Sequence, residues 1–352
     1  MKADLLRYRQ LLAPYMVTFL KQEQQRLHQK GYDWADDVFE RLVTFVPSGK
    51  LLRGSAVLLM TELFDGKPET ALPVAAAAEL MQSAVLIHDD IIDKDPLRRD
   101  APSIYTQYEQ LAHQKKLTNP THLGISFGIC VGDIGIFLGY NLLSQLKLQP
   151  TTQQQVMGLI SQEFTAVGLA EMYDVALNVS PEPVTREQIL KLHLQKTGRY
   201  TMALPLQLGA VVGGADQKTI TSLHALGEVL GTVFQLRDDE LGLFGTAAVI
   251  GKSEGSDVRE GKKTLYYLYA LEKATAAQRE RLQHLFGKSD LTLAELAEVR
   301  DAVTRSGAQM EVEREVTLLE HQVAELLEQL SLSPPQKQRL AAFIELVSHR
   351  SK

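Results

Sequence analysis

The sequence predicts an all-α protein. Apolar residues recur with the spacing of amphipathic or buried helices over most of the chain, and glycine and proline pairs separate one helical stretch from the next. No stretch shows the alternation of apolar and polar residues that a half-buried strand requires. The 352 residues are 45% hydrophobic and 23% charged, which is an ordinary globular composition with ample material for a core.

Composition also excludes some classes of protein. The formal net charge of -6 gives no basic surface for nucleic acid. The single cysteine, Cys130, excludes an internal disulfide framework and a cysteine-rich metal site, and fits a reducing compartment. The first residues lack the apolar core of an export signal. We therefore expect a cytoplasmic protein.

The N-terminal part predicts one or two amphipathic helices over residues 4–46, followed by a break at residues 47–49. Lys50 and Arg53 then stand at the start of the next helix, over residues 55–64. A helix start offers free N–H groups and positive potential, so two cations there suit an anion site. Taken alone, the pair also fits a solvated basic turn.

The apolar helix predicted for residues 73–92 ends in Asp89, Asp90 and Asp93. On a helix, Asp89 and Asp93 project from the same face, and Asp90 points about 100° away. Three carboxylates this close repel one another unless a cation compensates them. Hard oxygen ligands suit Mg²⁺ shared with a phosphorylated substrate. By itself the cluster also fits a solvated acidic helix end.

Residues 123–143 are apolar apart from a few positions and are long enough to span a membrane. Asp133 in the middle would cost roughly 3 kcal/mol on membrane insertion. The glycines around it permit close packing of buried helices. We therefore expect a core helix of a large bundle and no transmembrane segment.

Another helix is predicted for residues 151–173, and a capping box at residues 185–188 opens the next one. That helix carries Lys196 and Thr197. Gly198 and Pro205 follow, and both loosen helical hydrogen bonding. The helix is either kinked within a core or opened at a functional position.

A second acidic cluster, Asp238-Asp239-Glu240, lies near the end of a helix predicted for residues 217–241. Basic residues accompany both clusters. Arg98 and Arg99 follow the first in a proline-bounded loop, and a glycine- and lysine-rich loop over residues 251–264 follows the second. Two such clusters make a metal–diphosphate site the better hypothesis, with the loop as a lid over phosphate. From residue 265 onward the pattern is amphipathic helix.

In this order and spacing, the motifs resemble the trans (E-type) isoprenyl diphosphate synthases, and specifically the geranylgeranyl diphosphate synthases among them. The resemblance covers roughly residues 49–264. The motifs are Gly49-Lys50-x-x-Arg53, Gln82, Asp89-Asp90-x-x-Asp93 with Arg98-Arg99, Lys196-Thr197, Phe234-Gln235-x-x-Asp238-Asp239, and Gly251-Lys252 with Lys262.

The resemblance implies a single all-α domain over residues 1–352, a large helical bundle around a central cavity of the isoprenoid synthase type, usually in a homodimer. It implies a Mg²⁺-dependent prenyltransferase that condenses isopentenyl diphosphate with an allylic diphosphate, with three Mg²⁺ ions per site. The implied metal residues are Asp89, Asp90, Asp93, Asp238 and Asp239. The residues implied to bind the allylic diphosphate are Arg98 and Lys196, with Lys252 and Lys262 from the loop that would cover it. The residues implied to bind isopentenyl diphosphate are Lys50, Arg53, Gln82 and Arg99. Thr197 and Gln235 would face the reacting centre, and Glu171 and Asp174 would support them.

Four positions depart from the common family pattern: Leu51, where arginine is common, Asp100, where glycine is common, Glu171, usually glutamine, and Gly242, where many members carry a third aspartate. We interpret them as subfamily traits.

The length of the product follows from helix geometry below Asp89. The growing tail should pass Val85, Ala84 and Met81 on that helix. No aromatic residue closes the path one turn down, so we expect the twenty-carbon geranylgeranyl diphosphate, with longer chains as the second possibility.

Three other functions compete. A class I terpene cyclase would carry a different second metal motif and would not need Lys50, Arg53 and Gln82. A non-catalytic or regulatory subunit of a heteromeric synthase would tend to lose one carboxylate cluster. A helical metal-dependent phosphohydrolase would group histidines with aspartates, and His88 beside Asp89 is the only such pairing noted.

Overall fold

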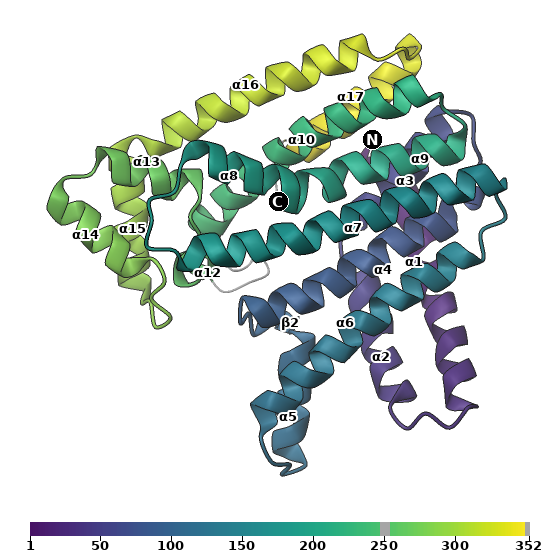
Figure 1. The fold of residues 1–352 in the computed structure, drawn as a ribbon, viewed down its shortest axis with the longest axis horizontal. Helices are drawn as coiled ribbons and strands as arrows, with labels where there is room; N and C mark the ends of the chain where they lie inside the picture. The colour runs from purple at the N-terminus through teal and green to yellow at the C-terminus, as the bar shows by residue number, and fades with distance from the viewer. Residues whose placement is uncertain (247–253, 349–352) are drawn as a thin grey trace. The chain divides into compact units, whose positions relative to one another are not determined.

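The computed structural model describes residues 1–246 and 254–348. Almost every described element is a helix, which confirms the all-α prediction (Figure 1). The chain divides into two compact units, Met1–Gly158 with Pro205–Asp216, and Leu159–Leu204 with Gln217–Lys352. The single domain expected from the sequence stays a prediction.

Most of the first unit is built from the N-terminal helices. It contains α1 (Lys2–His28), α2 (Ala35–Phe45), η1 (Val46–Ser48), α3 (Leu52–Leu63), α4 (Pro68–Ile92), α5 (Ile104–Gln114), α6 (Pro120–Ser144), the first part of α7 (Pro150–Val179) and most of α9 (Leu204–Gly213). Helix α4 lies at its centre and packs against α3 and α6. Its segment 74–78, one valine and four alanines, is buried, because short side chains let the neighbouring helices approach closely.

Glycines on α6 produce the closest of these approaches. A Cβ added at Gly135 would lie 3.0 Å from Cβ of Ala84, and one at Gly139 would lie 2.5 Å from Cγ of Met81. The contact therefore requires glycine at Gly139 unless Met81 moves. It fixes which side of α4 faces α6.

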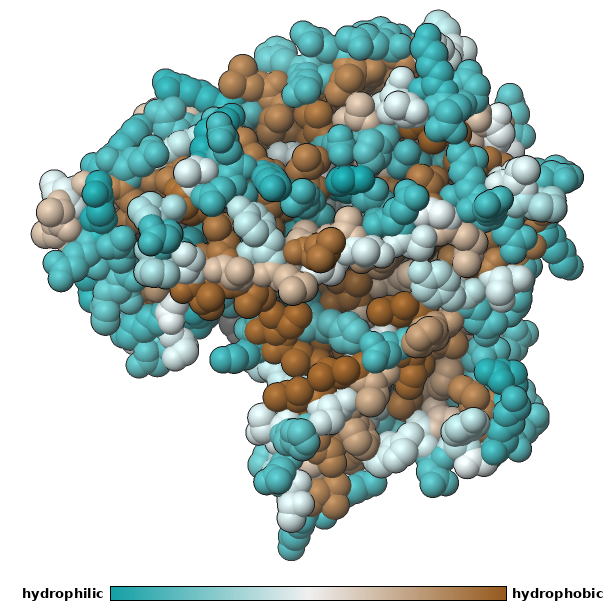
Figure 2. Space-filling view, viewed as in Figure 1, coloured by the Kyte–Doolittle hydropathy of each residue, from teal (hydrophilic) through white to brown (hydrophobic). Residues whose placement is uncertain are grey.

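Helix α6 is buried along one side only. Ile129 and Phe137 are exposed on the other side, and apolar side chains gather on the surface over this helix (Figure 2). The core-helix prediction is therefore correct for the side that faces α4 and wrong for the opposite side. Among the described helices, α4 and α6 are long and apolar enough to cross a membrane by length and composition, and the bent pair α2–α3 would make a third.

The sequence pattern missed one small feature, a pair of two-residue antiparallel strands, β1 (Leu97–Arg98) and β2 (Ala101–Pro102). Arg99 and Asp100 connect them with φ angles of 56° and 61°. Two consecutive residues with positive φ match the type I′ hairpin turn. Strands of two residues are too short to show alternation.

The second unit contains the remaining helices: the rest of α7, α8 (Arg186–His193), η2 (Leu194–Ala203), α10 (Gln217–Phe244), α12 (Ser256–Arg259), α13 (Leu265–Lys273), α14 (Ala276–Leu285), α15 (Leu293–Ser306), α16 (Ala308–Gln329) and α17 (Pro334–Ser348). Helix α10 packs against η2 and α16. Thr185 and Gln188 form the predicted capping box at the start of α8. Helix α7 extends past its predicted end at residue 173, so Asp174 lies inside it together with Glu171.

Candidate active site

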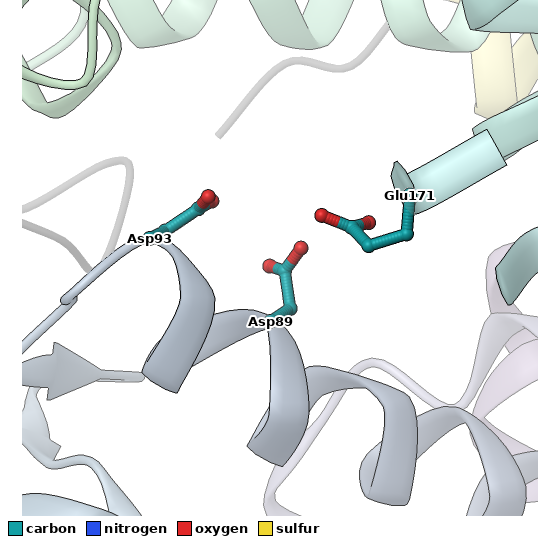
Figure 3. A group of neighbouring side chains, drawn as sticks. All are labelled: Asp89, Asp93 and Glu171. Carbon is teal, nitrogen blue, oxygen red and sulfur yellow. The ribbon is translucent and has the colours of Figure 1, made fainter. Parts of the chain in front are cut away.

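The first acidic cluster lies at the C-terminal end of α4. Asp89 and Asp93 project toward the same side of the helix, as their spacing predicts (Figure 3). Both side chains are partly exposed, and Asp89 retains 17% of its side-chain surface. Two accessible carboxylates on one helix face can share a hard cation, and their oxygen donors fit Mg²⁺.

Asp90 is turned inward and is fully buried. Arg98 donates from Nε to Asp90 Oδ1 at 2.6 Å, and its Nη2 lies 3.5 Å from Asp89 and 3.4 Å from Asp95. Burial alone would lower the pKa of Arg98, but the surrounding carboxylates, Asp90 foremost, raise it above the usual arginine value. Asp90 therefore holds Arg98 beside the cluster, and its expected part in metal binding stays a prediction.

The turn between β1 and β2 gives the two neighbouring arginines different partners. Arg98 pairs with the acidic cluster, whereas Arg99 donates to the carbonyl oxygen of Phe45 at 2.6 Å and to Ser48 Oγ at 3.0 Å. Asp100 occupies the second positive-φ position of the turn. Aspartate tolerates this conformation better than most residues, which explains how it stands where glycine is common.

Arg99 belongs to a second group of cations in the first unit. A Cβ at Gly49 would lie 2.7 Å from Arg99 Nη2, so the arginine lies against the segment that leads to Lys50 and α3. Burial lowers the pKa of Arg99, and the charges of Arg98 and Arg53 lower it further. Cations crowded in this way, at the start of a helix, suit a polyanion.

Glu79 lies beside these cations and belongs to none of the motifs named above. It is buried on α4, and its Oε1 accepts a hydrogen bond from the backbone N–H of Gly54 at 2.7 Å. Burial raises the pKa of Glu79, while Arg53 opposes the rise. A lone carboxylate in an otherwise apolar helix was the feature of the sequence that could have marked Glu79 as a site residue. One turn further, Gln82 is buried, and its Oε1 has no hydrogen-bond partner among the described residues.

The second acidic cluster lies on α10, in the second unit. Asp238 is exposed, whereas Asp239 is buried. Gln235 donates from Nε2 to Asp239 Oδ1 at 2.7 Å, and Nε2 of the buried His193 lies 3.2 Å from Asp239 Oδ2. Asp239 is thus held from both sides, and Asp238 is the carboxylate of this pair that a metal ion can reach. His193 has no motif around it, so sequence reasoning missed it.

Lys196 and Thr197 lie on η2, which is wound as a π-helix. The N–H of Leu204 donates to the carbonyl oxygen of Arg199, five residues earlier. The loosened hydrogen bonding predicted around Gly198 is therefore confirmed, and π-turns often mark functional positions. Lys196 Nζ lies 2.6 Å from Asp174 and 2.9 Å from Glu171, an ion pairing that the sequence did not predict.

Part of the basic loop can also be placed. Lys262 lies 2.6 Å from Glu260 and 3.9 Å from Asp257. Lys252 lies outside the described residues. Asp257 was not predicted as a site residue.

The residues expected to set product length lie on two sides of α4. Met81 and Ala84 are buried against α6, whereas Val85, one turn before Asp89, is partly exposed.

Comparison with known proteins identifies the family. The polyprenyl synthetase family model matches residues 33–303. The chain is 29% identical over 260 residues to a geranylgeranyl diphosphate synthase of Methanosarcina mazei, covering 74% of this chain and 73% of that protein. It is 30% identical over 269 residues to a short chain isoprenyl diphosphate synthase of Methanothermobacter thermautotrophicus, covering 76% of each.

A solved structure gives the same result. The chain resembles a geranylgeranyl pyrophosphate synthase of Corynebacterium glutamicum, crystallised with isoprenyl diphosphate and magnesium, with a TM-score of 0.92 and 27% identity, covering 98% of this chain and 99% of that one. The match of the family model to most of the sequence, with the resemblance in fold, shows that the chain belongs to the polyprenyl synthetase family.

Proposed function

We propose that the chain condenses isopentenyl diphosphate with an allylic diphosphate, head to tail and with trans geometry, and that its main product is geranylgeranyl diphosphate. One observation carries this proposal. The first unit holds two separate groups of cations, Arg98 in the carboxylate cluster, and Arg53 with Arg99, and we propose that each group binds one diphosphate. A terpene cyclase, with a single diphosphate substrate, has no use for the second.

We assign the metal-binding role to Asp89 and Asp93 on α4 and to Asp238 on α10, with Asp90 and Asp239 in support. The donor set fits Mg²⁺, because it consists of carboxylate oxygens with accessible positions. When bound, Mg²⁺ supplies positive charge that stabilises the departing diphosphate. We propose three ions, in keeping with the resemblance.

Two sets of residues in the chain then bind the two substrates. Arg98, Lys196, Lys252 and Lys262 neutralise the allylic diphosphate as its carbon–oxygen bond breaks. Lys50, Arg53, Gln82 and Arg99 hold isopentenyl diphosphate, whose double bond attacks the allylic cation. A proton is then lost to the released diphosphate.

Thr197 and Gln235 lie near the reacting carbon in this proposal. Because Asp239 accepts from the amide nitrogen of Gln235, the amide carbonyl oxygen remains to face the substrate. An oxygen dipole there stabilises positive charge on the allylic carbon. The lining should otherwise be apolar, which keeps water from the cation.

We further propose a cytoplasmic homodimer in which α6 is the contact between the two copies. Ile129 and Phe137 on its outer side are 45% and 71% exposed. Burying large apolar side chains of this kind stabilises an interface. Phe137→Glu should therefore convert dimers to monomers in sedimentation velocity, and an unchanged dimer would rule out α6 as the contact.

The test of the activity is incubation with Mg²⁺, isopentenyl diphosphate and each allylic primer, followed by sizing of the products. We expect the product to be a twenty-carbon diphosphate. The activity should be lost when EDTA is added and in the variant Asp89→Asn. The control Asp301→Asn, on the surface of α15, should keep it. Hydrocarbon formed from the primer alone would indicate a cyclase. Inactivity that a second protein restores would indicate a regulatory subunit.

A further inference from the structure

The turn that carries Lys50 has a strained backbone. Between η1 and α3 the chain passes through Leu51, whose φ angle is 53° and whose side chain is buried. A left-handed conformation is unfavourable for a residue with a bulky side chain, so the surrounding structure must hold it in place. Lys50 lies immediately before this residue, and its position therefore depends on the contacts that fix the turn.

Arg9, on α1, makes two of these contacts. Its Nη2 donates to the carbonyl oxygen of Pro47 at 2.9 Å, and its Nη1 donates to the carbonyl oxygen of Gly49. Both acceptors lie at the end of η1, where carbonyl groups lack partners within the helix. The planar guanidinium binds the two oxygens at once, and so it fixes their positions relative to each other.

A second arginine binds the same segment. Arg99 donates to the carbonyl oxygen of Phe45 and to Ser48 Oγ, as described above. One arginine from α1 and one from the turn between β1 and β2 thus hold the chain that leads to α3. Arg99 already has a role in the proposed site, whereas Arg9 lies ahead of residues 33–303, which the family model matches.

We propose that Arg9 is a positioning residue for isopentenyl diphosphate. By binding two carbonyl groups beside Lys50, it sets where the ammonium group of Lys50 and the first turn of α3, with Arg53, meet the diphosphate. Arg9 acts through the turn and does not itself bind the substrate. The inference rests on the proposed function and gives the N-terminal helix a part in one of its two diphosphate sites.

A purely structural role is the rival explanation, because Arg9 also ties α1 to the rest of the first unit. Arg7 offers a matched control. It lies on the same helix and donates two hydrogen bonds of 2.7 Å to Glu62, near the far end of α3. Arg7→Met therefore removes a comparable link from α1 and leaves the turn alone. Both variants would share a loss of stability, but only Arg9→Met should weaken the binding of isopentenyl diphosphate.

The experiment is steady-state kinetics on the full chain with Mg²⁺, in which one substrate is varied while the other is saturating. In Arg9→Met we expect the KM for isopentenyl diphosphate to rise about 10-fold, the change that the loss of one hydrogen bond of ordinary strength produces. The kcat and the KM for the allylic primer should stay unchanged. Arg9→Lys keeps one donor group and should lie between Arg9→Met and the original protein. Arg7→Met should leave the KM for isopentenyl diphosphate unchanged, whatever its melting temperature.

A double variant tests the route of the effect. If Arg9 acts through the turn that carries Lys50, the two residues serve one contact with the diphosphate. The KM rise in Arg9→Met combined with Lys50→Met should then be smaller than the product of the two single rises. Independent effects would multiply.

Three results would overturn the inference: an unchanged KM for isopentenyl diphosphate in Arg9→Met, an equal rise in Arg7→Met, or effects of Arg9→Met and Lys50→Met that multiply in full. If Arg9→Met does not fold, Arg9→Lys takes its place in each comparison. Failure of the proposed function is distinct, because the unaltered protein would then make no product from isopentenyl diphosphate and any primer.

Discussion

The contact between η2 and α10 depends on two glycines, and Gly231→Ala tests it. A Cβ at Gly231 would lie 2.3 Å from Cα and 2.4 Å from the carbonyl oxygen of Gly198. Ordinary contacts begin near 3.4 Å, so the two backbones must separate by about 1.1 Å. Both obstructing atoms belong to the backbone, which cannot rotate away as a side chain can.

The cost follows from packing. Overpacking of this kind destabilises a core by about 1–3 kcal/mol, against a gain of about 1 kcal/mol for alanine over glycine in a helix. Gly168→Ala on α7 is the matched control, because a Cβ there has nothing within 4 Å and shows the gain alone. In urea denaturation, the two variants should therefore differ by about 1–3 kcal/mol, with Gly231→Ala the less stable.

Activity should fall with stability. Lys196 and Thr197 immediately precede Gly198, so displacement of η2 moves both. We expect a lower kcat and an unchanged KM for isopentenyl diphosphate, whose proposed site lies in the other unit. If Gly231→Ala were as stable as Gly168→Ala, the reasoning about the close contact would be refuted.

Three further predictions concern the first unit. Ala84→Phe should shorten the product, because the ring enters the proposed path of the tail; an unchanged product distribution in a folded variant would contradict that path. Asp100→Val should cost about 1–2 kcal/mol in urea denaturation, since a β-branched residue resists a positive φ, whereas Asp100→Gly should be tolerated. Burial raises the pKa of Glu79 above its ordinary value of 4.5, so the stability that this carboxyl contributes is lost as pH rises through the raised pKa. Glu79→Gln should remove that decline in melting temperatures measured between pH 5 and pH 8, and a decline equal to that of the original protein would count against it.

Much of the local structure could be predicted because its causes are local. The capping box at Thr185 needs only residues within one turn. The loosened helix after Lys196 follows from Gly198, which lacks a side chain, and from Pro205, which lacks an N–H. The facing carboxylates Asp89 and Asp93 follow from helical spacing alone.

What the sequence could not reveal depends on contacts between distant segments. Arg9 meets Pro47 and Gly49 only because the intervening chain turns back, and no spacing rule predicts such a return. The pairing of His193 with Asp239 has the same origin. Helix α6 was misjudged on one side, because its composition is nearly uniform and does not reveal which face meets α4.

Because Arg98 pairs with Asp90, the chain does not need a metal ion in order to fold. A crowded group of acids normally opposes compaction, yet here the partly buried guanidinium of Arg98 already offsets part of that repulsion. The chain can thus reach its native packing in a magnesium-poor environment and take up the metal later, together with its substrate. A chelator should silence such a protein and leave it folded.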